Sequence, residues 1–136
     1  MFRSLTIAFL FTLTATAVSA QDSLIVKSIY FGGGSFYIDD IQLQEMKEFI
    51  DAVENLEYYE VVIFSHTDNI GGKEYNEWLS RMRSMSVYQE LLNINVPKEL
   101  MEIKDLGYSN PLYTNRSHGG RRMNRRVDII LSPVVF

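Results

Sequence analysis

Residues 65–83 of the chain read SHTDNIGGKEYNEWLSRMR, and no other stretch of the sequence is as informative. His-Thr-Asp follows an apolar run, so we expect it at the end of a strand, and the Gly-Gly pair after it predicts a turn. A helix is expected to begin after this turn. On that helix Asn76, Leu79 and Arg83 share one face, and positions 76 and 83 look exposed. The spacing therefore brings the Asp68 carboxylate and the Arg83 guanidinium to one patch.

Two interpretations of this patch follow from the residues alone. Asp68 can simply support the turn, because Asp-Asn before glycine is ordinary turn chemistry, and Arg83 is then a solvated helix charge. Alternatively, the carboxylate accepts hydrogen bonds from an ammonium while the planar guanidinium donates to a carboxylate, as a zwitterionic ligand requires. Free backbone N–H groups at the helix start also favour an anion. The spacing leaves both interpretations open.

The remainder of the chain predicts one α+β domain. Runs rich in β-branched and aromatic residues alternate with segments whose apolar residues recur every three or four positions. This order, β-α-β-α-β-β, indicates a mixed sheet with helices packed on it. The expected elements are a strand at 24–31, a helix that Asp39 or Asp40 caps and that reaches about residue 53, a strand at 58–64, a helix at 73–92, a strand at 101–107, a polar loop at 108–122 and a strand at 126–131.

Two finer expectations concern packing. Residues 61–64 are all apolar, so the strand at 58–64 is expected to be central in the sheet and covered on both faces. The helix at 73–92 is expected to bury one apolar stripe. The stripe consists of Tyr75, Leu79, Met82, Val87, Leu91 and Leu92.

The N-terminal residues predict export. Residues 1–20 contain a basic residue, a short apolar run and small residues at the end, which is the layout of a cleaved secretory signal peptide. An uncleaved membrane anchor is the alternative, although the run is shorter than the roughly 20 residues of a spanning helix. Residues 21–136 then form one domain.

The composition narrows the possible partners and modifications. The chain has no cysteine, which excludes disulfides and the lipid-bearing cysteine of a bacterial lipoprotein. The net charge of −4 argues against nucleic acid as a partner.

Residues 66–87 closely resemble the core motif of OmpA-like peptidoglycan-binding domains, H-T-D-x-x-G-x-x-x-x-N-x-x-L-S-x-x-R-x-x-x-V. Two flanking stretches are similar to other signatures of this family. IYFGGGSFYI at 29–38 resembles its first strand and loop, and GRRMNRRVDI at 120–129 resembles its closing G-R-x-x-N-R-R-V. The resemblance covers nearly all of the chain after residue 20. The fixed positions of the core motif are all filled, by His66, Thr67, Asp68, Gly71, Asn76, Leu79, Ser80, Arg83 and Val87.

The resemblance implies a ligand, the diaminopimelate of the peptidoglycan peptide stem, whose side-chain end carries both an ammonium and a carboxylate. It implies that Asp68 holds the ammonium and Arg83 the carboxylate, with Asn76 and Arg125 as supporting residues. The same motif adds Thr67, Gly71 and Leu79 to the expected ligand site. The protein is then a non-catalytic module without a cofactor, which binds the wall in the periplasm of a Gram-negative-type bacterium and links an envelope component, such as a protein complex, to it.

The sequence departs from the family pattern at two places. Ser65 stands where the family usually has glycine, which adds one hydroxyl at the strand end. The run at 32–34 is three glycines, more than this loop usually contains. A looser loop is expected to weaken the contacts that its backbone makes, but neither change touches the two charged residues.

Several features have alternative interpretations. His66 and Asp68 form an H-x-D pair of the kind that binds metals, but the chain has only 2 histidines, so no metal site is expected. His66 is instead interpreted as a structural residue bonded to the neighbouring loop. The four arginines within 121–126 form a basic cluster that could meet phosphate or anionic lipid. If Arg125 and Arg126 lie in a strand, at most one faces the pocket, and the other pairs with acids on the surface.

Functions from two other classes remain open. The same fold can serve as a protein-interaction adaptor in the envelope, through an edge strand or the arginine cluster. A wall hydrolase is the enzymatic alternative. The sequence favours it little, because the chain has no cysteine and its spacing demands no Ser-His-Asp arrangement.

Overall fold

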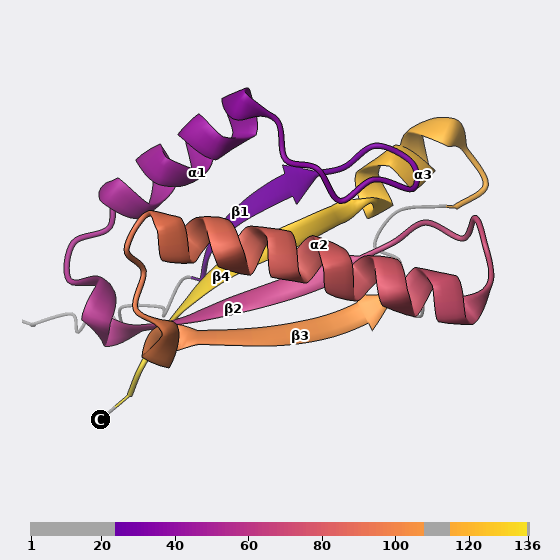
Figure 1. Cartoon of the computed structure of the whole chain (residues 1–136). Helices are drawn as coiled ribbons and strands as arrows, with labels where there is room; N and C mark the ends of the chain where they lie inside the picture. The colour runs from indigo at the N-terminus through magenta and orange to yellow at the C-terminus, as the bar shows by residue number, and fades with distance from the viewer. Residues whose placement is uncertain (1–23, 108–114, 136) are drawn as a thin grey trace, which may run out of the picture.

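The computed structural model describes residues 24–107 and 115–135 of the 136-residue chain. Its centre is one four-stranded sheet in the order β1-β4-β2-β3 (Figure 1). β4 runs antiparallel to both β1 and β2, whereas β2 and β3 run parallel, so the sheet is mixed. The strands are β1 at Ile25–Tyr30, β2 at Tyr59–His66, β3 at Met101–Gly107 and β4 at Arg126–Pro133.

Two long helices cover one face of this sheet (Figure 1). α1, Asp40–Asp51, lies on the β1 side, and α2, Lys73–Asn93, crosses in front of β2 and β3. The short helix α3, His118–Asn124, leads into β4. Turns of 3-10 helix at Leu56–Tyr58 and Lys98–Leu100 precede β2 and β3. The segment between β1 and α1 runs toward α3 and returns, so it borders the ends of the strands (Figure 1).

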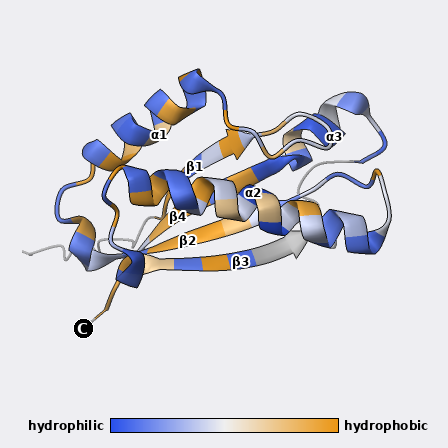
Figure 2. Cartoon of the chain, viewed as in Figure 1, coloured by the Kyte–Doolittle hydropathy of each residue, from blue (hydrophilic) through white to orange (hydrophobic). Residues whose placement is uncertain are grey.

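The core lies between the sheet and the two long helices. Alternate side chains of the inner strands point toward α1 and α2, and their removal from water is the main driving force for packing. Figure 2 shows the apolar stretches of β2 and β4 beneath helices whose surfaces alternate between polar and apolar residues. The strand side of the core consists of Ile29, Val61, Ile63, Val127, Ile129 and Leu131, and the helix side includes Met46, Ile50, Val87 and Leu91.

The start of α1 is fixed to the end of β1. Asp39 is the N-cap, and its carboxylate accepts the N–H of Gln42 at 2.9 Å. The amide of Gln42 in turn accepts from the Tyr30 N–H at 2.6 Å and donates to the Tyr30 carbonyl at 2.9 Å. Both ends of the intervening loop are therefore held in place.

The predicted α+β fold with a mixed sheet is confirmed, and one element differs. The stretch at 108–122 is not a loop throughout, because His118–Asn124 is helical. The glycine pair at 119–120 conceals this helix, since glycine disfavours helix. Its N-cap was the available signal, because the Ser117 hydroxyl accepts the Gly120 N–H at 2.9 Å.

Two packing expectations need correction. Tyr75 is 44% exposed and does not belong to the buried stripe of α2, whereas Leu79, Val87 and Leu91 do. β2 is central, as predicted, but among the described residues only one face of the sheet carries helices. On the other face Phe64 is half-buried, with the Lys104 ammonium 5.8 Å from its ring centre.

The predicted signal segment at 1–20 lies outside the described residues. Within the ranges that the structure covers, no helix combines the length and the apolar character needed to cross a bilayer.

Candidate functional site

Arg83 is fully buried, with 0% of its surface exposed. Its Nε donates to the Ser35 carbonyl at 2.8 Å and its Nη2 to the Gly32 carbonyl at 3.0 Å, while the guanidinium lies 5.3 Å from the ring centre of Phe31. These contacts fasten α2 to the glycine-rich loop after β1. The third nitrogen, Nη1, is buried and has no hydrogen-bond partner among the described residues. It is a donor for which a ligand oxygen would supply the partner.

The charge of Arg83 is retained at neutral pH despite this burial. Burial lowers the pKa of its guanidinium to about 10, the nearby Asp68 carboxylate opposes this effect, and the Arg125 guanidinium adds to it. A buried cation of this kind lacks full compensation from the protein. An incoming carboxylate would provide it, together with a charge-assisted hydrogen bond.

Asp68 follows β2 and is 6% exposed. Its Oδ1 accepts the Ile70 N–H at 3.0 Å, which closes the turn, and its Oδ2 accepts from Nη1 of Arg125 at 3.0 Å. The turn-supporting interpretation of Asp68 is therefore correct. The two interpretations are compatible, because the same carboxylate lies in the electric field of two guanidinium groups.

Arg125 is the C-cap of α3 and precedes β4. Its Nε donates to the Phe31 carbonyl at 3.2 Å, so it joins the end of β1 to Asp68. Arg126 begins β4, is 4% exposed and pairs with Asp128 at 3.1 Å. One arginine thus lies beside the site, as expected, but its neighbour pairs within the protein rather than on the surface.

Gly71 and Asn76 shape the turn that carries Asp68. Gly71 has a φ of +97°, and a Cβ there would lie 2.7 Å from Cδ1 of Tyr75. The Asn76 amide donates to the Gly71 carbonyl at 3.4 Å, which fixes the turn to the first part of α2. Any other residue at 71 would therefore have an unfavourable backbone conformation, and its Cβ would also clash with the Tyr75 ring.

Asn76 and Arg83 are not exposed, which corrects the prediction for both positions. They are 1% and 0% exposed, because the face that they share with Leu79 is the inward face of α2. The apolar core continues on this face only from Val87 onward. Near the ends of the strands, the inward face of α2 meets loop carbonyls instead of apolar side chains. Asn76 and Arg83 donate hydrogen bonds to these carbonyls.

Thr67 and Leu79 complete the set of predicted site residues, and both are buried, with 1% and 3% of their surfaces exposed. The Thr67 hydroxyl has no partner in the described part of the chain, and neither has the hydroxyl of Ser80 on the same turn of α2 as Leu79. Thr67 directly precedes Asp68 in the sequence, and Ser80 lies three positions before Arg83 on α2. The structure brings Asp68, Arg83 and Arg125 together, with the remaining predicted residues around them.

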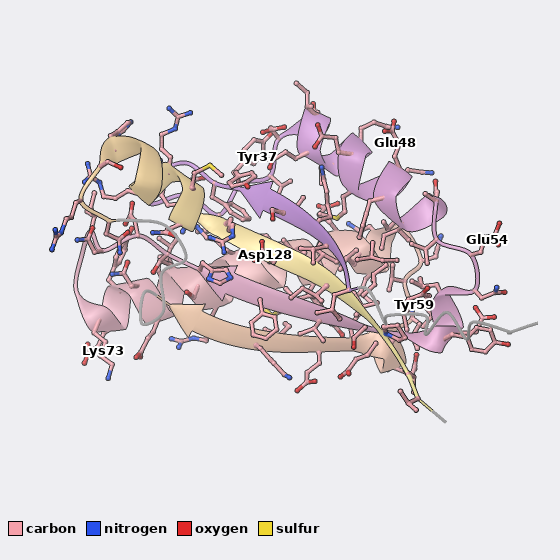
Figure 3. The ribbon with its side chains drawn as sticks, turned by 180° about the vertical axis from the view of Figure 1, so that it is seen from behind. Tyr37, Glu48, Glu54, Tyr59, Lys73 and Asp128 are labelled. Atoms are coloured by element: carbon pink, nitrogen blue, oxygen red, sulfur yellow. The ribbon has the colours of Figure 1, made fainter. Side chains whose placement is uncertain are left out.

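A second polar network lies on the far face of the sheet, where Figure 3 shows Asp128 projecting from β4. Asp128 Oδ2 lies 3.1 Å from Nε2 of His66, and the Ser28 hydroxyl donates to Asp128 Oδ1 at 2.6 Å. His66 is thus a structural residue, as expected, but its partner is on β4 rather than in a loop. Burial raises the pKa of Asp128, but the hydrogen bonds from His66 and Ser28 and the charge of Arg126 hold it below its usual value.

This network combines serine, histidine and aspartate without the geometry of a nucleophilic triad. The Ser28 hydroxyl donates to the carboxylate, and the imidazole meets the same carboxylate, so the imidazole is not placed to accept the serine proton as it would be in a triad. In the ranges that the structure describes, no group of three or more His, Cys, Asp or Glu side chains is arranged to hold a metal ion.

Among the described residues, two hollows lie along the loop that accepts hydrogen bonds from Arg83. The first, of about 560 Å³, lies where β1 ends and includes Phe31, Gly32 and Arg125 in its wall. The second, of about 780 Å³, runs between the loop after β1 and α2, with Phe36, Tyr37 and Met85 in its wall. The loop after β1 contributes to both, with Gly32 in the wall of the first and Ser35 in the wall of the second, and both residues accept hydrogen bonds from Arg83.

A sequence model described as the OmpA family matches residues 30–125. The chain belongs to the OmpA family. The match contains every element from the end of β1 to the residue before β4, including the arginines at 83 and 125. It confirms the resemblance noted in the sequence.

Relatives of this OmpA-family chain include two proteins described as lipoproteins. The outer-membrane lipoprotein YfiB of Pseudomonas aeruginosa is 41% identical over 66 residues, which are 48% of this chain and 39% of that protein. The probable lipoprotein YiaD of Escherichia coli is 36% identical over 74 residues, which are 54% of this chain and 34% of that protein. The chain thus matches less than half the length of either relative.

Solved structures agree with the fold. The peptidoglycan-associated lipoprotein of Burkholderia pseudomallei superposes with a TM-score of 0.72 and 25% identity, over 77% of this chain and 89% of that one. The periplasmic domain of Helicobacter pylori MotB superposes with a TM-score of 0.69 over 85% of this chain and 79% of that one. At 18% identity, this second likeness concerns the fold alone.

Proposed function

We propose that this OmpA-family chain binds the peptide stem of peptidoglycan, non-covalently and without catalysis, and so links an envelope component to the cell wall. Membership of the family over residues 30–125 supports the proposal. So does the likeness to a protein whose description states that it is associated with peptidoglycan. The location that fits this role is the periplasm of a Gram-negative-type bacterium.

The observation that carries the proposal is the pairing of a buried, incompletely bonded guanidinium with a carboxylate. Nη1 of Arg83 has no partner among the described residues, and Asp68 lies close enough to influence the pKa of Arg83. Diaminopimelate presents an ammonium and a carboxylate on one carbon atom at the end of its side chain. Its carboxylate would accept from Arg83, and its ammonium would donate to Asp68 beside Arg125.

Binding at Arg83 requires a small movement of the loop after β1. Gly32 and Ser35 both accept hydrogen bonds from Arg83, and Nη1 is shielded from solvent. Gly33, between them, has open space around it. The glycine run therefore gives this loop the freedom to shift while Asp39 and Gln42 hold its far end.

The expected affinity for one stem is weak to moderate. Each charge-assisted hydrogen bond contributes roughly 1.5–3 kcal/mol, and immobilising the ligand and the loop offsets part of this gain. The wall presents many identical stems, so modest affinity is sufficient for attachment.

Co-sedimentation with purified peptidoglycan sacculi tests the proposal. Wild-type protein is expected in the pellet and Asp68→Asn in the supernatant, because asparagine keeps the shape of the turn but removes the charge that an ammonium needs. Asp51→Asn, an exposed position on α1, is the matched control and is expected to sediment like the wild type. Equal sedimentation of Asp68→Asn, with an unchanged circular dichroism spectrum, would contradict a role for this carboxylate.

A second candidate function is that of an envelope adaptor, and the groove beside α2 favours it. The groove is lined by apolar residues such as Phe36 and Met82, and Tyr37 at its edge is 70% exposed. The arginine cluster favours this role less, because Arg125 and Arg126 are engaged within the protein. Capture of an envelope protein that persists in Asp68→Asn and is lost in Met85→Glu would support the adaptor.

A further inference from the structure

Three aromatic side chains form a continuous exposed surface beside the proposed stem site. Tyr75, Trp78 and Phe36 are 44%, 42% and 38% exposed. The ring centres of Tyr75 and Trp78 are 5.9 Å apart with their planes tilted by 32°, and those of Trp78 and Phe36 are 6.0 Å apart at 90°. We call these three residues the aromatic shelf.

The aromatic shelf is continuous with the site that holds Arg83. The Tyr75 ring lies against Gly71 in the turn after Asp68, and its hydroxyl reaches Gly34 in the loop after β1. Phe36 directly follows Ser35, whose carbonyl accepts from Arg83. The shelf therefore spans both loops that enclose the charged pair.

The exposure of these rings is not explained by the fold. None of the three belongs to the core cluster, and the buried stripe of α2 runs along its opposite face. Exposed aromatic residues that gather at one place commonly mark a binding surface. The surrounding positions are charged, since Glu74, Glu77 and Arg81 are exposed on the same helix. The shelf is thus a set of apolar ring faces among polar groups rather than a dry apolar patch.

We infer that the aromatic shelf binds the sugar rings of the glycan strand while the stem peptide occupies the site at Asp68 and Arg83. A pyranose ring has an apolar face of C–H groups, which packs on an aromatic ring, and a rim of hydroxyls, which require polar neighbours. The shelf offers both. This inference rests on the proposed function, because it places the sugar next to a bound stem.

The distances are compatible with this arrangement. An extended peptide covers at most ~3.5 Å per residue, so a sugar two residues away from the diaminopimelate lies on the order of 10 Å from it. Trp78 and Arg83 leave α2 on different faces, so the connection between the two sites runs through Tyr75, whose ring lies against Gly71 in the turn that carries Asp68. A sugar on the shelf and a stem at Asp68 can therefore be bound at the same time.

The chain contains 1 tryptophan, and it is Trp78, so its fluorescence reports directly on the aromatic shelf. Two ligands are compared, a diaminopimelate-containing stem peptide and the same stem attached to its N-acetylglucosamine–N-acetylmuramic acid disaccharide. We expect the disaccharide ligand to change the Trp78 emission and to bind roughly fivefold more tightly than the free stem, as for other aromatic contacts. The free stem is expected to bind without this change in emission.

Trp78→Leu is the matching variant, because leucine keeps an apolar side chain and removes the ring. It is expected to lower the affinity for the disaccharide ligand to that for the free stem, measured by calorimetry, and to leave binding of the free stem unchanged. Tyr58→Leu, at a 55% exposed tyrosine before β2, is the control and is expected to have no effect.

The outcomes separate the two proposals. Equal affinity of wild-type protein for both ligands, or an unchanged preference in Trp78→Leu, overturns the glycan inference and leaves stem binding intact. Failure of both ligands to bind overturns stem binding and the glycan inference together.

Discussion

The guanidinium of Arg83 donates to the carbonyl oxygen of Ser35 over 2.8 Å, although 48 residues separate the two in the sequence. Through this bond and a second one to the Gly32 carbonyl, the arginine connects α2 to the loop after β1. The residue proposed to bind the ligand is therefore also a structural residue. Variants at this position must be measured for stability and binding together.

Arg83→Lys is expected to lower the free energy of unfolding by about 1–2 kcal/mol, because an ammonium cannot donate to both loop carbonyls in the fixed directions of a guanidinium. Stem binding is expected to fall at least tenfold. Urea denaturation and calorimetry measure the two effects. Arg81→Lys, two positions earlier on the exposed side of α2, is the control and should change neither. Full stability in Arg83→Lys would mean that the two backbone bonds contribute nothing.

Asp68 and Arg125 are expected to be energetically coupled, because their side chains are 8% and 12% exposed and meet at 3.0 Å. Removing one partner leaves the other poorly compensated, so Asp68→Asn and Arg125→Gln should each destabilise the fold by about 1–3 kcal/mol. The double variant should lose less than the sum. A double-mutant cycle by urea denaturation gives the coupling, which we expect to exceed about 0.5 kcal/mol. Simple additivity would argue against this ion pair in solution.

Gly71→Ala is expected to destabilise the protein by about 1–3 kcal/mol, because its φ of +97° is unfavourable for alanine and the added Cβ would meet the Tyr75 ring at 2.7 Å. Gly33→Ala is the control, since its Cβ would have nothing within 4 Å. It is expected to leave the stability unchanged or slightly raised, because alanine restricts the unfolded chain. Thermal unfolding of both variants tests this difference, and equal Tm values would show that the turn at 71 adapts.

The network around Asp128 predicts acid sensitivity. The folded-state pKa of Asp128 lies below its ordinary value of 3.8, so the carboxylate stabilises the fold above about pH 4. This stabilisation is lost as the pH falls through the lowered folded-state pKa. Asp128→Asn should therefore have a lower Tm than the wild type at neutral pH and a smaller further decrease on acidification to about pH 3. Identical pH profiles for the two proteins would exclude Asp128 as the responsible group.

The elements of the fold are predictable from the sequence where a strong local pattern, such as a periodicity or a helix cap, marks them. Periodicity and β-branched residues placed β2 and α2 within one or two residues of their observed bounds, and of the two predicted caps of α1, Asp39 and Asp40, the structure selects Asp39. The pattern of residue types does not predict α3, because its glycine pair outweighs the serine cap at 117. The bounds of short elements therefore depend on capping contacts, which the pattern of residue types indicates only weakly.

The sequence proposes members for the site but does not predict their geometry. A gapped motif identifies Asp68, Asn76 and Arg83 together, but helical spacing alone cannot show which face of α2 points inward when polar residues occupy that face. For this reason the spacing predicts an exposed Arg83, whereas the side chain is buried. Its burial follows from two loop carbonyls that require donors, and such backbone acceptors are invisible in a sequence.

Calorimetric titration with two stem peptides tests the central claim most directly. One peptide contains diaminopimelate and the other contains lysine, which has the side-chain ammonium but lacks the neighbouring carboxylate. If Arg83 holds that carboxylate, the diaminopimelate peptide binds at least tenfold more tightly, and Asp68→Asn abolishes binding of both. Equal binding of the two peptides by the folded wild-type protein would contradict the account.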